Sequence, residues 1–571
     1  MGQSSSTDQI SPAQREAETL AASTGALPTL REAFSRLSDP ETGLIPLDSI
    51  RKCFALVIEN PSSGTSGTLA PKEFPVLLAH VGSAIVDQFF LVEKAGLTWV
   101  EFLRGYTKCC GRTVASTSLN NLFKLVFVSA NEKAGLPVKL QVDPSEDDDG
   151  KLSGSLLPAD LLNLLWACWT LSWDSRNLRS STSKGSLGRP DVDHLVLSAV
   201  ESCAESADKL NFWDAKTSGL DIELPVSKVL TWALKTVPYL ADCLAQFVNS
   251  RLGYLTSHQG KWEDLYFPVH GISPAEVSNT GLLTCGRAWA ISLTLRDNLS
   301  EEISKACFLG ESEDINESLL YRSSLHGKGL NRFWSHVEGY LGPVIMLIDA
   351  CESNNVERRL TIGALTHQGF ENKDIFYGSS GNLYALGPVF HVFAASGKEK
   401  NFIYSHLHPA VRVYDPHPKP VGIAFGGSIG NERVFMDEDF SKVTLRHHAV
   451  DKTYQHGSLF PNQGFLPTEM SVLEVEIWGL GGKRAKDVQT SYKKREEIFT
   501  EQRRKVNNRG PLNLKTLLFC NFFLRKFLND APFFYVFLQV DLKAFGDWED
   551  SPEKMMMDMM ADPNRVRRQD R

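Results

Sequence analysis

The sequence predicts an α+β protein in which helical regions precede an antiparallel sheet. One observation is a set of apolar residues at helical spacing, which are Leu330, Phe333, Trp334, Val337 and Leu341. Gly342 and Pro343 then end that helix. The apolar run 344–348 that follows is too short for a helix and is typical of a buried strand. In 473–478 apolar residues alternate with other residues, which is the period of a strand with one buried face.

Composition limits the class of protein. A hydrophobic content of 42% and a charged content of 22% are ordinary for a soluble globular protein, and 571 residues suffice for several domains. The net charge of −8 argues against a general nucleic-acid binder, so no nucleic acid is expected as a partner. The ten cysteines form no Cys-x-x-Cys pair and follow no secretory signal, which favours reduced thiols in the cytosol.

The N-terminal segment 1–26 is predicted to be a disordered tail that carries a lipidation signal. Gly2 follows Met1, and a serine stands at position 6, which is the pattern for N-myristoylation. The alternative is a tail that merely begins with Met-Gly. One myristoyl chain binds membranes weakly, with about 10⁴ M⁻¹, so a peripheral membrane location would depend on a partner.

Residues 27–135 are predicted to be a degenerate EF-hand-like helical domain. Gly43 and Ile45 occupy the turn and pairing positions of a first loop, and Glu101 occupies the last ligand position of a second loop that starts at Phe90. Calcium needs six to eight oxygen ligands, and most of the ligand positions lack them. We therefore expect EF-hand-shaped helix pairs without the ion, and calcium is not expected as a ligand.

Two helical regions follow. Residues 136–190 are predicted to contain an acidic loop, a buried helix over 156–173 and a Ser-rich linker. The apolar run is short for a membrane span and is interrupted by Asp160, so a buried helix is favoured. Residues 191–256 are predicted to be a helical subdomain that is broken at Pro238.

The segment 281–482 carries four motifs in a fixed order. They are Ser323, Ser324, His326 and Gly327; Gly342 and Pro343; Gly426 and Gly427 with Asp437 and Glu438; and Glu474, Glu476, Trp478 and Gly479. In this order they resemble the landmarks of a TLDc domain. The N-terminal features fit the N-myristoylated, EF-hand-like branch of that family, related to the mTOR-associated lysosomal and the oxidation-resistance TLDc proteins.

The resemblance implies a two-sheet β-sandwich with flanking helices. It also implies a role in oxidative-stress resistance and binding to the vacuolar proton-pumping ATPase, with no agreed catalytic residues. The sequence departs from the family pattern at 361–365 and at 445–448. Surface contacts at those two places need not carry over.

Candidate chemistry is limited to histidines and one pair of carboxylates. Seven histidines lie in 391–456, and His406 and His408 would share one face of a strand, as in a zinc site. Further ligands at suitable spacing are missing, so no metal and no cofactor are expected. Glu474 and Glu476 could act as an acid/base pair, but a solvated strand face is favoured because no basic or nucleophilic neighbour stands beside them.

The C-terminal segment 483–571 is predicted to contain a basic helix, an anomalous Phe-rich segment and a Met-rich tail. The helix over 483–506 either docks on an acidic partner or membrane surface or stands exposed. The Phe-rich segment 507–539 interrupts a charged tail, and we interpret it as a translated intron, with an interfacial anchor as the alternative.

The sequence therefore predicts a non-enzymatic regulatory protein, peripheral on a cytoplasmic membrane face, with the vacuole or lysosome as the candidate organelle. The expected partner is the vacuolar proton-pumping ATPase, in oxidative-stress or lysosome-linked signalling. The alternatives are a metal- or thiol-dependent redox enzyme that uses the histidine-rich span, and a calcium-sensing adaptor.

Overall fold

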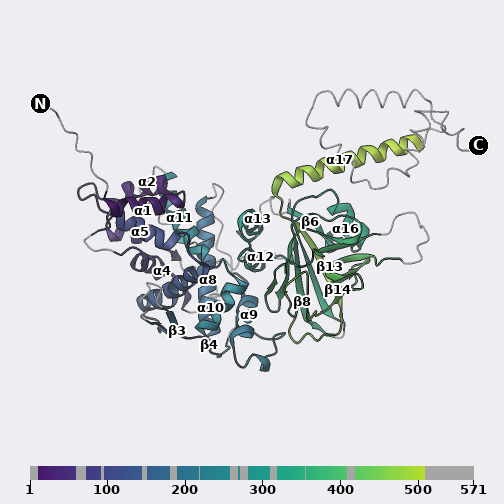
Figure 1. Cartoon of the computed structure of the whole chain (residues 1–571), viewed down its shortest axis with the longest axis horizontal. Coiled ribbons are helices and arrows are strands. Elements are labelled where there is room, and N and C mark those ends of the chain that lie inside the picture. The colour runs from purple at the N-terminus through teal and green to yellow at the C-terminus, as the bar shows by residue number, and fades with distance from the viewer. Residues whose placement is uncertain are drawn as a thin grey trace, which may run out of the picture. The chain divides into compact units, whose positions relative to one another are not determined.

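The computed structural model describes residues 11–58, 73–91, 96–143, 151–179, 190–217, 219–257, 268–269, 281–308, 318–353, 355–407 and 418–507 (Figure 1). The chain divides into two compact units, 1–490 and 491–571. Several predictions lie outside the described residues: lipidation of Gly2, the acidic loop at 144–150, most of the Ser-rich linker, and the intron hypothesis beyond Asn507.

The N-terminal region is helical, as predicted. Its helices are α1 (Pro12–Ser23), α2 (Leu27–Leu37), α3 (Leu47–Cys53), α4 (Phe74–Phe89) and α5 (Trp99–Cys110). The loops that precede α3 and α5, which were predicted to be EF-hand-like, meet through an antiparallel bridge between Ile45 and Leu97, whose two N–H···O distances are 3.0 and 2.9 Å. Ile45 is the residue predicted to make this pairing.

Helix α1 corrects the prediction of a disordered tail over 1–26. Ala17 and Ala21 are buried in the contact of α1 with α5, and the indole N–H of Trp99 donates to Glu18 at 2.9 Å. The small side chains at positions i and i+4 let the two helices approach closely. The hydrogen bond from Trp99 lowers the pKa of Glu18.

Glu101 has a structural partner in the second loop. Its carboxylate accepts the N–H and the hydroxyl of Thr98, both at 2.7 Å, and the Thr98 hydroxyl accepts the N–H of Glu101. This reciprocal pair is a capping box at the start of α5. The carboxylate that the loop pattern assigns to an ion therefore caps a helix.

The middle region contains more helices and a small sheet. It comprises α6 (Ala115–Lys124), a π-helix (Leu125–Ala130), α7 (Asn131–Ala134), β2 (Leu140–Asp143), β3 (Lys151–Leu156), α8 (Pro158–Arg179), α9 (Asp193–Cys203), a 3₁₀ turn (Ala207–Lys209), β4 (Leu224–Pro225), α10 (Val226–Thr236) and α11 (Asp242–Ser257). The short strands β1 (Val57–Ile58) and β5 (Pro268–Val269) pair in parallel.

Helix α8 confirms the predicted buried helix. Most of its side chains are buried, and Asp174 forms a two-point ion pair with Arg251 of α11, at 2.7 and 2.8 Å. Among the helices that the structure describes, none is both long and apolar enough to cross a membrane.

The C-terminal half of the first unit is an antiparallel sheet, which confirms the α+β class. The strand order is β11-β10-β8-β7-β16-β15-β14-β13-β12-β9, and β6 also pairs with β16. The strands are β6 (Leu319–Arg322), β7 (Val344–Glu352), β8 (Asn355–Thr366), β9 (Lys373–Tyr377), β10 (Gly381–Gly387), β11 (His391–Phe393), β12 (Ile403–His406), β13 (Gly422–Ser428), β14 (Asn431–Asp437), β15 (Lys442–Leu445) and β16 (Thr468–Gly479).

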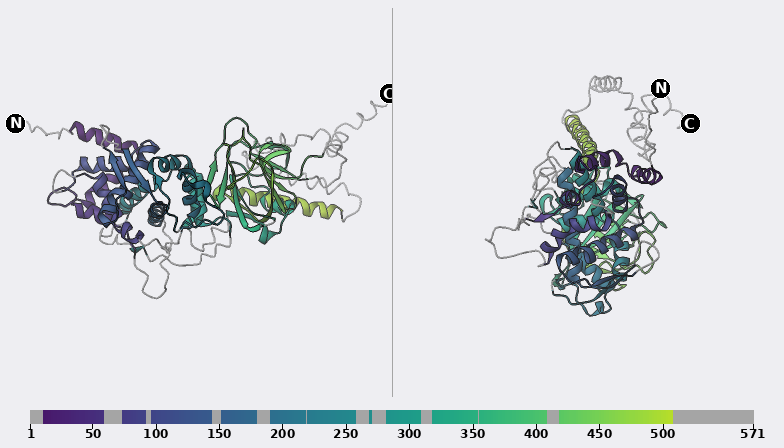
Figure 2. Two further views of the ribbon diagram at one scale, coloured as in Figure 1. Left: turned by 90° about the horizontal axis from the view of Figure 1, so that it is seen from below. Right: turned by 90° about the vertical axis from the view of Figure 1, so that its left-hand side faces the viewer.

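The hydrogen-bonded path is continuous, so the two expected sheets are one sheet that curls on itself (Figure 1 and Figure 2). Strand β16 lies in the middle of this path and pairs with β15, β7 and β6. Among the residues that the structure describes, four helices accompany the sheet: α12 (Cys285–Ser292), α13 (Asp297–Phe308), α15 (Ser323–His326) and α16 (Leu330–Val337).

The sheet has two hydrophobic cores. Inside the curl, Val475 and Ile477 pack with Phe333 of α16 and other apolar residues. On the opposite face, Trp478 belongs to a core that also contains Trp289 of α12 and residues of α8 to α11. The helical regions and the sheet therefore share one hydrophobic core.

The predicted basic helix is present as α17 (Gly482–Asn507). In its first turns Ala485 packs close to Gly342, and the Gln489 amide donates to the carbonyls of His336 and Glu338 at 2.8 and 3.2 Å. Helix α17 continues from there into the second unit.

Candidate functional site

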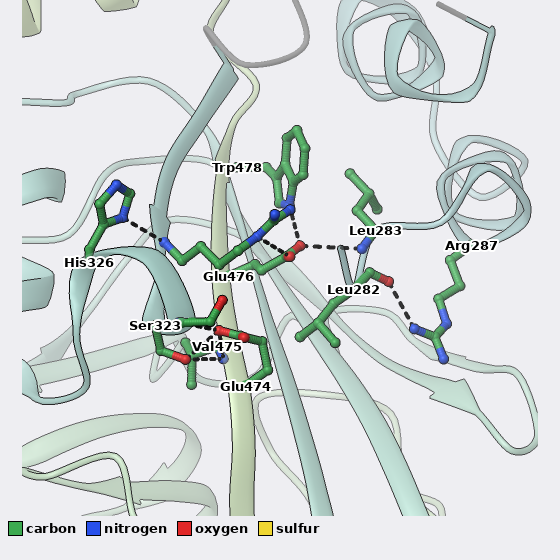
Figure 3. A network of polar contacts seen from close by, with 11 residues as sticks. Leu282, Leu283, Arg287, Ser323, His326, Glu474, Val475, Glu476 and Trp478 are labelled. Atoms are coloured by element: carbon green, nitrogen blue, oxygen red, sulfur yellow. Dashed lines mark hydrogen bonds and ion pairs between the residues drawn. The ribbon is translucent and has the colours of Figure 1, made fainter. Parts of the chain in front are cut away.

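The candidate site lies along β16, where Glu474 meets Ser323 and Ser324 of the first motif, and Glu476 meets Arg322 and Leu283 (Figure 3). The register of β16 against β7 shifts between Val472 and Glu474. Leu473, at this bulge, is 37% exposed, although the alternating pattern places it in the core. Beyond the bulge both faces of the strand are buried.

Glu474 connects β16 to the turn that carries the first motif. Its Oε1 accepts the Ser323 hydroxyl and, at 2.9 Å, the N–H of Ser324. The Ser323 oxygen in turn accepts the N–H of Val475 at 3.0 Å. Burial alone would raise the pKa of Glu474, but the hydrogen bonds from Ser323 and Ser324 outweigh it and lower the pKa below its usual value.

Glu476 has different surroundings, and the prediction of a solvated face is wrong for it. Its side chain is fully buried, with Oε1 in an ion pair with Arg322 Nε at 2.7 Å. Its Oε2 accepts the indole N–H of Trp478 at 2.9 Å and the N–H of Leu283 at 3.3 Å. Arg322 stands directly opposite Glu476 in the β6–β16 pairing. The carboxylate is buried because a segment far away in the sequence covers it.

That covering segment leads into α12 and is fixed from both sides. Arg287 donates to the carbonyl of Leu282 at 2.8 Å, and burial lowers the pKa of Arg287. From the helical region, Asp191 accepts the N–H of Gly286 at 2.7 Å and the hydroxyl of Thr284 at 2.5 Å. The start of α12 is therefore held by Glu476 of the sheet and by Asp191 of the helical region.

The other residues of the first two motifs shape turns and close contacts. His326 Nδ1 accepts the N–H of Arg322 at 3.0 Å, and its ring stacks on that of His336 with centroids 4.0 Å apart. Gly327 has a φ of +87°, and its carbonyl accepts the Tyr321 hydroxyl at 2.6 Å. The Pro343 carbonyl accepts the N–H of Leu480 at 2.8 Å.

The third motif and the end of the fourth are also structural. Gly426 and Gly427 have φ values of +69° and +81° in β13. Asp437 accepts the N–H groups of Ser441 and Lys442 at 2.8 and 3.2 Å, and the Glu438 carbonyl accepts the N–H of Leu330 at 2.8 Å. A Cβ at Gly479 would lie 2.6 Å from the Tyr340 ring, so only glycine fits there without a shift.

The described histidines of the 391–456 span are distributed over several contacts. His391 Nε2 lies 2.8 Å from Glu201, and His447 stacks on Phe465. His406 lies on β12, whereas His408 and His417 are outside the described residues. Within the part of the chain that the structure describes, no three His, Cys, Asp or Glu side chains are grouped as a metal site would need.

Several thiols are in surroundings that disfavour the reactive thiolate. Burial raises the pKa of Cys53 to about 12 and the pKa values of Cys203 and Cys285 to about 11. A thiolate is the nucleophilic form of cysteine, so these three residues are poor redox centres.

Sequence reasoning found both glutamates and both serines but missed Arg322, Asp191 and Leu283. Arg322 could have been found, because it directly precedes Ser323 and ends the strand that pairs with β16. Asp191 and Leu283 carry no such signal, since their roles depend on how α12 packs between the sheet and the helical region.

The segment that carries β16 and most of this network matches a TLDc domain. The family model described as "TLDc domain" matches residues 292–481, which lie inside the predicted segment 281–482. Among curated proteins, the chain is similar to "Restriction of telomere capping protein 5" of Zygosaccharomyces rouxii, with 25% identity over 139 residues. That similarity covers 24% of this chain and 25% of the relative, so the chain spans about a quarter of the relative it matches.

Proposed function

We propose that the protein is a non-enzymatic regulatory protein whose TLDc domain binds another protein. The observation that carries this proposal is that Glu474 and Glu476 are both engaged in contacts within the protein. The carboxylate of Glu474 accepts hydrogen bonds from Ser323 and Ser324, and that of Glu476 is buried and accepts the N–H of Leu283. A general acid or base must reach its substrate, and both groups are committed to contacts inside the protein.

The preferred partner is the vacuolar proton-pumping ATPase, at a vacuolar or lysosomal membrane, in stress or growth signalling. This choice rests on the likeness of residues 292–481 to the TLDc family. The name of the similar Zygosaccharomyces rouxii protein refers to telomere capping, and the short shared segment gives that role little support here. Myristoylation of Gly2 would supply a weak membrane contact, with the protein partner providing the rest.

Affinity purification from detergent-solubilised and from intact membranes tests the partner and the lipid separately. The wild-type chain and Gly2→Ala should both recover pump subunits after detergent, whereas only the wild-type chain should remain on intact membranes. Failure of both chains to recover pump subunits in detergent would reject this partner. Equal membrane retention of both chains would reject the role of Gly2.

Metal analysis addresses the rival enzyme hypothesis. A metalloenzyme should be purified with close to one equivalent of a transition metal, whereas a regulatory protein should carry less than about a tenth of an equivalent. A stoichiometric metal that chelators remove together with folded structure or activity would favour the enzyme.

A further inference from the structure

A groove lies between helix α10 and the strand β11 at the edge of the sheet. Its volume is about 520 Å³, and α10, β11 and the segment 455–458 line it. A space of this size is within the range of ligand-binding pockets. None of the motif residues of β16 lines it, so it is separate from the network in Figure 3.

One wall of the groove is a single polar face of α10. Lys228, Thr231 and Lys235 stand at helical spacing and line the groove together with Trp232. The indole of Trp232 is held in place by its hydrogen bond to Ser198, at 3.0 Å. Both lysines are exposed, so their ammonium groups can reach a ligand.

The opposite wall is held by a buried arginine. Arg433 donates to the carbonyls of Gln455 and Gly457 at 2.7 and 2.8 Å, and its guanidinium lies 4.3 Å from the centre of the Phe393 ring. Asp451 pairs with Arg433 at 2.8 Å. This wall is therefore formed before any ligand arrives, which reduces the entropy cost of binding.

The ionisable side chains that line the groove are all basic. Two lysines and the histidines His391 and His456 line the groove, and the described lining residues include no aspartate or glutamate. Nearby acids compensate only in part: Glu201 pairs with His391 at 2.8 Å, and the largely exposed Glu205 lies 3.7 Å from Lys228. An exposed pair at that distance is weak and can be exchanged for a ligand carboxylate.

We propose that this groove binds an acidic peptide segment of a partner protein in an extended conformation. Lys228 and Lys235 are seven positions apart on α10, which corresponds to about 10 Å along a helix. Three residues of a peptide in the polyproline II conformation span about 9 Å and complete one turn, so side chains three positions apart lie on the same side. Acidic side chains three positions apart would thus meet the two lysines, while hydroxyls such as that of Thr231 bind the peptide between them.

Fluorescence anisotropy with the full-length chain tests the site directly. The probe is a fluorescein-labelled peptide of four Glu-Ser-Gly repeats, and the comparison peptides carry four adjacent glutamates or lysine at each glutamate position. We expect the spaced acidic peptide to bind most tightly, and increasing salt to weaken it. Equal binding of the lysine peptide, or of the peptide with adjacent glutamates, would overturn the proposal.

Charge reversal on α10 should weaken binding of the spaced peptide at least about tenfold in Lys228→Glu/Lys235→Glu, since attraction becomes repulsion. The matched control is Lys398→Glu/Lys400→Glu, which makes the same charge change on exposed residues outside the groove and should bind like the wild type. Lys228→Ala/Lys235→Ala gives a milder change, and circular dichroism checks that each variant is folded. Equal affinity of both charge-reversed variants would contradict the proposal.

Inorganic phosphate distinguishes a peptide groove from a site for small anions. Millimolar phosphate should displace the peptide no better than chloride at the same ionic strength. If phosphate alone competes as well as unlabelled peptide, the groove binds small anions and the proposal is wrong. This test does not involve the proton pump, so its outcome is independent of the proposed function.

Discussion

Glu474 and Glu476 stand two positions apart on β16 and hold different parts of the molecule together. Glu474 is partly exposed and binds the turn at Ser323 and Ser324, which belongs to the same sheet domain. Glu476 is fully buried and binds both Arg322 and the segment that leads into α12. One motif therefore carries both an internal hydrogen-bond network and a joint between regions. Substitutions at Glu476, Asp191 and Glu474 test this difference.

Removal of the buried carboxylate should have the largest effect. In Glu476→Ala, Arg322 would keep its charge with a side chain only 14% exposed, and the N–H of Leu283 would lose its acceptor. Breaking a buried ion pair in this way costs about 3–5 kcal/mol in the free energy of unfolding. Urea denaturation measures the cost.

Glu469→Ala is the matched control for that measurement. Glu469 lies on the same strand, with a 63% exposed side chain that is 3.4 Å from Lys442, so the change should stay within about 0.5 kcal/mol. If Glu476→Ala lowers the free energy of unfolding no more than this control does, Glu476 does not hold the sheet and the α12 segment together.

Loss of the contact from the helical region should have an intermediate effect. Asp191→Ala removes the acceptor for Gly286 N–H at the first turn of α12, which is worth about 1 kcal/mol at an exposed helix cap. Hydrogen exchange should show faster exchange of the Gly286 amide, with less change in Asp191→Asn, which keeps one acceptor. Unchanged exchange in Asp191→Ala would show that α12 is held by the sheet alone.

The sequence was sufficient for features that depend on local pattern. The alternation in 473–478 predicted a strand, and the loop pattern predicted the pairing role of Ile45. The helical spacing from Leu330 to Leu341 predicted α16, but the helix ends at Val337, and Leu341 is 63% exposed. These features follow from periodicity and turn chemistry, which act over a few residues.

The surroundings of β16 could not be predicted in the same way. A bulge near Leu473 takes that side chain out of the core, and a one-residue irregularity of this kind leaves no clear mark in an alternating pattern. From the sequence alone, Glu476 is predicted to be a surface residue. It is buried because the segment leading into α12, almost two hundred positions earlier, covers it. Helix α1 differs, because its start carries a local signal: Ser11 caps the helix and Pro12 stands at its first position. Its packing against α5 is the part that the sequence does not reveal.

The smallest effect is expected at Glu474, and it depends on pH. Because its pKa is lowered in the folded protein, the folded state binds fewer protons than the unfolded state below the ordinary glutamate value. The stabilisation is therefore complete above that value and is lost as the pH falls through the lowered pKa. Urea midpoints measured from neutral pH into this acidic range should fall less steeply in Glu474→Gln than in the wild type. Parallel profiles would mean that the hydrogen bonds of Ser323 and Ser324 do not depend on the charge of Glu474, and the contrast with Glu476 would then be one of burial alone.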